Sequence, residues 1–138
     1  MTASPPRSDI NAIARVALDV YDQDVSIWTQ LRRTGYRYGE ALRADQLIPI
    51  LTVHPEWVDA WITLADDKRS TGWYIQQRDN EFAVRSYPPS TDRPPMFYDD
   101  RVSAVAEFIV REVDDVSKPW LASLRQWLAN RLRKPSSG

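Results

Sequence analysis

The sequence predicts an α+β fold, mostly helical, in which four to six helices pack on a short antiparallel β-hairpin at about residues 73–87. Apolar residues recur at a spacing of three and four before residue 70 and again after residue 99, which is typical of amphipathic helices. Between these regions, apolar and polar residues alternate as in strands. The chain has 138 residues, a length that favours one domain, which we place over residues 8–134 between disordered tails at 1–7 and 135–138.

The N-terminal third predicts two helices. Ser8 and Asp9 can cap the first, whose apolar stripe extends to Tyr21. Asp22 or Asp24 can cap the second, in which Val25, Trp28 and Leu31 repeat and which ends near Gly35. Residues 36–44 are interpreted as a turn that leads into the next helix.

Two further helices precede the hairpin. Asp45 is the expected cap of a helix over residues 46–53, with Pro49 near the first turn, where a missing amide costs little. Pro55 is expected to start the next helix, in which Trp57, Trp61 and Leu64 share one face and form part of the core.

The hairpin is predicted from alternation over residues 73–77 and 82–87, joined by a turn at residues 78–80. Because a two-stranded hairpin is marginal in water, it must lie on helices or pair with another strand. Four prolines, at 88, 89, 94 and 95, then predict a stiff connection to a helix capped by Asp99 or Asp100.

A last helix is expected from Ser117 or Pro119 to residue 134, with Trp120 and Trp127 on its apolar side. Its basic face, from Lys118 to Lys134, carries five cations and no acid, whereas residues 99–115 hold six acids against two arginines. Docking of this helix on the core is therefore the simplest interpretation, and contact with a partner or an anionic membrane is the alternative.

The composition argues against several classes of function. With 18 Lys and Arg against 19 Asp and Glu, the chain lacks the basic excess of a general nucleic-acid binder. It has no cysteine for a disulfide or a thiolate site, and its longest apolar run, residues 47–53, is far shorter than the roughly 18 residues of a membrane span. Without a signal peptide pattern at its start, the protein is expected to be cytoplasmic.

The sequence contains no catalytic or cofactor motif, so we expect no catalytic residue, no bound cofactor and no metal site. The single histidine, His54, precedes a helix-starting proline and is interpreted as a capping or packing residue. An alternative is a small metal-dependent enzyme that uses the acidic pairs at Asp66, Asp67, Asp99 and Asp100, and a third possibility is a homo-oligomeric structural or adaptor protein.

A protein partner is the favoured ligand, because aromatic residues are concentrated in the connection that follows the hairpin. Prolines in this connection lower the entropy lost on docking, and aromatic side chains can act as anchors. The candidate partner-binding residues are Tyr87, Arg93, Met96, Phe97 and Tyr98.

Four segments follow one another between residues 72 and 112: Gly72-Trp73-Tyr74, Phe82-Ala83-Val84, Met96-Phe97-Tyr98-Asp99 and the helix Ala104 to Glu112. In this order they resemble the small immunity proteins of bacterial polymorphic-toxin and contact-dependent inhibition systems. It implies a protein without chemistry or cofactor of its own, which binds a cognate toxin stoichiometrically and occludes the toxin's active site.

Overall fold

A computed structural model describes residues 9–37, 39–67 and 72–118 and confirms the α+β class. Within these ranges the chain forms six helices and one three-stranded antiparallel sheet. The elements are α1 Ile10–Ala14, α2 Val16–Gln23, α3 Ile27–Arg33, α4 Ala44–Thr52, α5 Pro55–Asp67, β1 Gly72–Arg78, β2 Glu81–Tyr87, β3 Met96–Tyr98 and α6 Arg101–Ser117.

The first predicted helix is present but interrupted, so that α1 and α2 replace a single element. Asp9 caps α1 as expected, since its side chain accepts a hydrogen bond from the Asn11 amide. Arg15, with a φ of -89° and a ψ of -7°, is a turn residue that separates the two helices.

The cap predicted for the second helix is wrong: Ser26, not Asp22 or Asp24, precedes α3 and accepts from the Thr29 amide at 3.1 Å. Asp24 instead ends α2 in the left-handed conformation, with a φ of 53°, which asparagine and aspartate tolerate better than most residues. The helix end near Gly35 is confirmed, and this glycine has a φ of 85° that suits its position after a helix.

The predicted cap of α4 is also wrong, because the helix begins at Ala44 and Arg43 takes the capping position. The Gln46 side chain accepts a hydrogen bond from the Arg43 amide at 2.9 Å, which fixes this earlier start. Pro49 consequently lies inside the helix, not in its first turn, and removes one intrahelical hydrogen bond. The next helix, α5, begins at Pro55 as expected.

The predicted hairpin is formed by β1 and β2, with Asp79 and Asn80 as the turn and Asp79 at a φ of 51°. A third strand, β3, pairs with the far side of β2, so that the sheet order is β1-β2-β3. From the sequence, Met96, Phe97 and Tyr98 were expected to lie in the proline-stiffened connection after the hairpin. This expectation was wrong, because these residues form β3. A strand of only three residues that follows two prolines has no recognisable local pattern, and its pairing with β2 becomes evident only in the folded structure.

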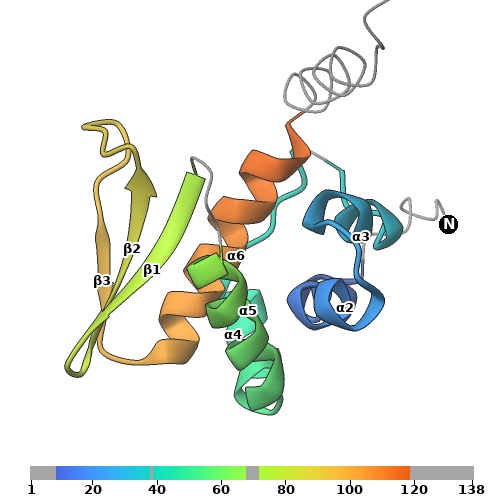
Figure 1. Ribbon diagram of the computed structural model, residues 1–138, viewed down its shortest axis with the longest axis horizontal. Helices are drawn as coiled ribbons and strands as arrows, with labels where there is room; N and C mark the ends of the chain where they lie inside the picture. Colours follow the sequence, from blue (N-terminus) through green and yellow to red (C-terminus); the bar gives the residue numbers. More distant parts are fainter. Residues whose placement is uncertain (1–8, 38, 68–71, 119–138) are drawn as a thin grey trace, which may run out of the picture.

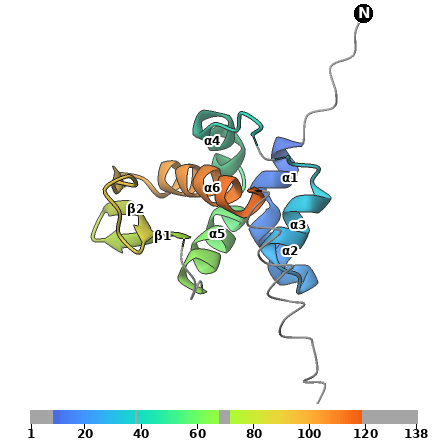
Figure 2. The same ribbon diagram turned by 90° about the horizontal axis from the view of Figure 1, so that it is seen from above.

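Helix α6 runs through the middle of the molecule, with the sheet on one side and α1, α2 and α3 on the other (Figures 1 and 2). Its N-cap is Asp100, whose side chain accepts from the Ser103 amide at 2.8 Å. The largest fully buried side chains include Trp61 and Phe108, which confirms the central position expected of Trp61, whereas Trp57 is only partly buried. None of the helices in the described ranges has the length and apolarity needed to cross a membrane.

The last predicted helix, with Trp120 and Trp127, lies outside the described residues except for its expected start at Ser117, which is the last residue of α6. Both predicted tails, residues 1–7 and 135–138, also lie outside the described residues.

Candidate protein-binding face

The alternation of the strands places four of the five candidate partner-binding residues on two opposite sides of the sheet, and the fifth, Arg93, lies in the loop between β2 and β3. In β3, Met96 and Tyr98 point toward α6, and Phe97 between them points away. At the end of β2, Tyr87 also lies on the side away from α6. Phe97 and Tyr87 are 54% and 61% exposed, so the structure leaves these two of the five residues on an open surface.

We call the side of the sheet that points away from α6 the outer face. In both views nothing in the described part of the chain covers it (Figures 1 and 2). The strand register assigns eight side chains to this face: Tyr74, Gln76 and Arg78 of β1, Glu81, Ala83, Arg85 and Tyr87 of β2, and Phe97 of β3.

Arg85 is held at the centre of the outer face by two neighbours. Its Nε donates to Oε1 of Gln76 at 2.8 Å, and its guanidinium carbon lies 5.5 Å from the centroid of the Phe97 ring. Among the described residues, no carboxylate forms an ion pair with Arg85. A fixed, half-buried guanidinium beside an exposed aromatic ring is therefore available to a binding partner.

The two inward residues of β3 attach the sheet to α6. The Tyr98 hydroxyl donates to Oε1 of Glu107 at 3.3 Å, and Arg111 approaches the Met96 sulfur at 3.4 Å. Desolvation, followed by the charge and hydrogen bond of Glu107, raises the pKa of Tyr98 to about 12 despite the opposing charge of Arg111. These two candidate residues thus hold the sheet on the helix, and α6 occupies the side on which a partner would have to approach them.

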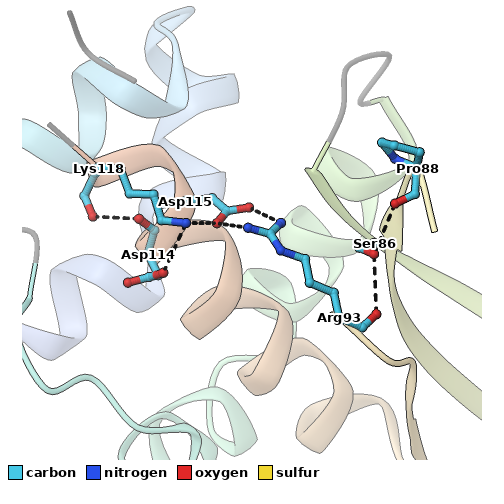
Figure 3. A network of polar contacts seen from close by, with 7 residues as sticks. Ser86, Pro88, Arg93, Asp114, Asp115 and Lys118 are labelled. Carbon is cyan, nitrogen blue, oxygen red and sulfur yellow. Dashed lines mark hydrogen bonds and ion pairs between the residues drawn. The ribbon is translucent and has the colours of Figure 1, made fainter. Parts of the chain in front are cut away.

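Arg93, the fifth candidate, connects the proline-rich loop to the C-terminal part of α6 (Figure 3). Its two terminal nitrogens lie 3.0 and 3.2 Å from the two carboxylate oxygens of Asp115, and Lys118 Nζ contacts the same carboxylate at 3.1 Å. The Arg93 guanidinium also lies 5.3 Å from the centroid of the buried Trp73 ring, and Arg111 approaches that ring at the same distance. We call the contacts of Arg93 with Asp115 and Trp73 the Arg93 clamp.

The loop between β2 and β3 is closed at its base by Ser86. Its hydroxyl is within 3.4 Å of the Pro88 carbonyl and 3.5 Å of the Arg93 carbonyl, which draws the two ends of the loop together (Figure 3). Together with the Arg93 clamp, this contact fixes the loop that carries the chain from Tyr87 to Phe97.

Sequence reasoning missed Arg85 and Tyr74, the outer-face residues of the hairpin itself. The sequence contains a signal for Arg85, because residues two apart in a strand share a face. Since Tyr87 was a candidate, Arg85 could have been predicted to lie beside it on the same face. Extending the alternation across β3 required the register, which only the fold supplies.

Of the acidic residues considered for a metal-dependent enzyme, Asp100 caps α6. The neighbouring pair at the end of α6 is engaged by cations, because Asp115 is paired with Arg93 and Lys118 lies 3.9 Å from the carboxylate of Asp114. The ring of His54 stacks on Trp57 with 3.7 Å between centroids, as expected of a packing residue. In the part of the chain that the structure describes, no three side chains of the His, Cys, Asp or Glu type gather as a metal site would require.

Comparison of the chain with protein-family models, with curated proteins and with solved structures finds no match.

Proposed function

We propose that the protein is a non-catalytic binding domain whose protein partner docks on the outer face of the sheet. The observation that carries this proposal is the exposure of Tyr87 and Phe97 on either side of Arg85, on a sheet face that no described element covers. Tyrosine, phenylalanine and arginine are enriched at protein interfaces, since they combine large apolar area with polar or charged tips.

The rigidity of the face supports the proposal. A three-stranded sheet held on α6 by Tyr98 and the Arg93 clamp loses little conformational entropy when a partner docks. The Nε of Arg85 is already bonded to Gln76, so this side chain is also ordered in advance.

For the identity of the partner, the resemblance of residues 72–112 to immunity proteins leads us to propose a cognate toxin, neutralised in the cytoplasm by occlusion of its active site. The alternative of a metal-dependent enzyme receives less support, because Asp100 already serves as a helix cap. A stabilising effect of Mg²⁺ or Mn²⁺ on thermal unfolding would favour the enzyme, since only a ligand of the native state raises the melting temperature.

The proposal is tested by affinity purification of the tagged protein from its own host, followed by quantitative mass spectrometry. We expect one partner at near-equal amounts with the wild type, and a loss of about tenfold or more with Phe97→Ser, as for a central aromatic anchor. The matched control is Val53→Ser, which removes a 70% exposed apolar side chain at the end of α4 and leaves the outer face intact. The partner should be toxic when expressed alone and harmless when the wild-type protein is co-expressed.

Two results contradict the proposal. Recovery of the wild-type protein without a stoichiometric partner removes the binding function, and equal recovery of one partner by Phe97→Ser and the wild type removes the outer face as its site.

A further inference from the structure

We infer that the chain on its own forms a symmetric homodimer in which two outer faces stack, with the two-fold axis at Ala83, so that Glu81 of each copy meets Arg85 of the other. This inference goes beyond the proposed function and is independent of it, because it concerns the purified chain without any other protein.

The charge pattern along the central strand carries the inference. On the outer face of β2, Glu81 and Arg85 lie at equal distances on either side of Ala83, at roughly 7 Å each by the rise of a strand. Neither charge forms an ion pair within the described part of the chain. Consider a two-fold axis that lies between the two stacked faces and crosses the strands at right angles at Ala83. Rotation about this axis reverses the direction of the strands, and therefore places Glu81 of each copy opposite Arg85 of the other.

The same operation makes the neighbouring strands complementary. Tyr74 is paired with Arg85 and Arg78 with Glu81, so the axis brings Tyr74 of one copy opposite Arg78 of the other, which allows a cation–π contact.

On the other side of the sheet, Phe97 is paired with Ala83 and lies at the level of the axis. It meets Phe97 of the second copy, and two exposed aromatic rings leave water together.

The pattern also selects this orientation over the other symmetric one. A two-fold axis parallel to the strands would bring Arg85 against Arg85 and Glu81 against Glu81, and like charges that face each other are destabilising. Only the antiparallel stacking satisfies both charges at once.

The size of the face sets the expected strength. Seven residues at about 3.3 Å and three strands at about 4.8 Å give a footprint of roughly 23 by 14 Å, which is smaller than the face of a permanent dimer. We therefore expect a weak, reversible dimer with a dissociation constant on the order of 10 to 100 µM, which leaves the outer face accessible at low concentration.

The test is sedimentation equilibrium of the purified full chain over about 5 to 500 µM at low salt. The wild-type mass should rise from 16.0 kDa toward twice that value. Glu81→Arg and Arg85→Glu each replace two attractions with two repulsions and should weaken the dimer about tenfold or more. The double variant Glu81→Arg with Arg85→Glu restores opposite charges and should return the dissociation constant to within about threefold of the wild type.

The matched control is Asp22→Arg, which changes the net charge as Glu81→Arg does but lies on an exposed part of α2, at the far end of the molecule from the sheet (Figure 1). It should leave the dissociation constant unchanged. Far-ultraviolet circular dichroism of each variant shows that it remains folded.

The highest concentration, about 500 µM, is about fivefold above the largest expected dissociation constant. A wild-type chain that stays monomeric at this concentration overturns the inference. A dimer that Glu81→Arg and Asp22→Arg affect equally, or that the double variant fails to restore, overturns the proposed pairing. The sedimentation experiment uses the purified chain alone, so its result does not depend on whether the affinity experiment finds a different protein as partner.

Discussion

Arg93 and Asp115, which are 22 residues apart in the chain, form a two-pronged ion pair with nitrogen to oxygen distances of 3.0 and 3.2 Å. This pair fastens the loop between β2 and β3 to α6, and the sheet is thereby held at both ends of β3. Arg93, which was a candidate for partner contact, therefore forms its contacts with residues of the same chain.

We expect Arg93→Met to lower the free energy of unfolding by about 1–3 kcal/mol, since it leaves the Asp115 carboxylate, only 18% exposed, with fewer donors. Urea unfolding followed by tryptophan fluorescence measures the change. The control is Arg43→Met, because Arg43 and Asp45 form an ion pair whose side chains are 66% and 71% exposed, and its loss should cost less than about 0.5 kcal/mol. Equal costs for the two variants would show that the Arg93 clamp contributes no more than an ordinary surface pair.

The fold class could be predicted because its signals are local. The period of apolar residues marks the helices, and the alternation of β1 and β2 across the two-residue turn at Asp79 and Asn80 marks the hairpin. Helix starts were less predictable. Ser26 caps α3 although nearby aspartates offered an equally good sequence signal, and Arg43 precedes α4 although Asp45 offered a better one.

The candidate site was only partly predictable, for a different reason. Phe97 and Tyr98 are adjacent in the sequence and chemically alike, yet β3 turns one outward and the other onto Glu107. The pairing of β3 with β2 decides this, and such a non-local pairing has no counterpart in the local pattern.

Tyr98 should ionise late in a spectrophotometric titration of the folded protein. The difference between the phenolate absorbance of the wild type and that of Tyr98→Phe should show a pKa of about 12. Glu107→Gln should lower this pKa, because after burial the charge and the hydrogen bond of Glu107 contribute most to raising it. The folded state binds this proton more tightly than the unfolded chain, whose tyrosines titrate near 10.0. The contribution to stability is therefore fully present below pH 10 and is lost as the pH rises toward 12. An unchanged Tyr98 pKa in Glu107→Gln would contradict the assigned cause.

Trp61 combines complete burial with a hydrogen bond across the core. Its Nε1 donates to the Ala14 carbonyl at 2.7 Å, and its ring meets the edge of Phe108 with 6.1 Å between centroids. We expect Trp61→Ala to cost roughly 3–5 kcal/mol through the cavity it leaves, and Trp61→Phe about 1–3 kcal/mol because the Ala14 carbonyl loses its donor. Trp57→Phe, at a partly buried position, is the matched comparison and should cost less than about 1 kcal/mol in the same urea assay. A similar small cost for Trp61→Phe would show that the hydrogen bond is replaced by water.

Asp79 holds the hairpin turn at a φ of 51°, a left-handed conformation that side chains with a Cβ adopt at a cost. Glycine has no such cost, so Asp79→Gly should raise the free energy of unfolding by about 0.5–1 kcal/mol. Asp79→Val should lower the free energy of unfolding by about 1 kcal/mol or more, because a β-branched side chain is least compatible with a positive φ. Thermal unfolding of both variants measures the difference. Asn80→Gly is the control, since Asn80 is not at positive φ and glycine there gains nothing from the native conformation. If Asp79→Gly and Asn80→Gly shift the melting temperature in the same direction and by the same amount, the effect comes from the flexibility of the unfolded chain and not from relief of strain at Asp79.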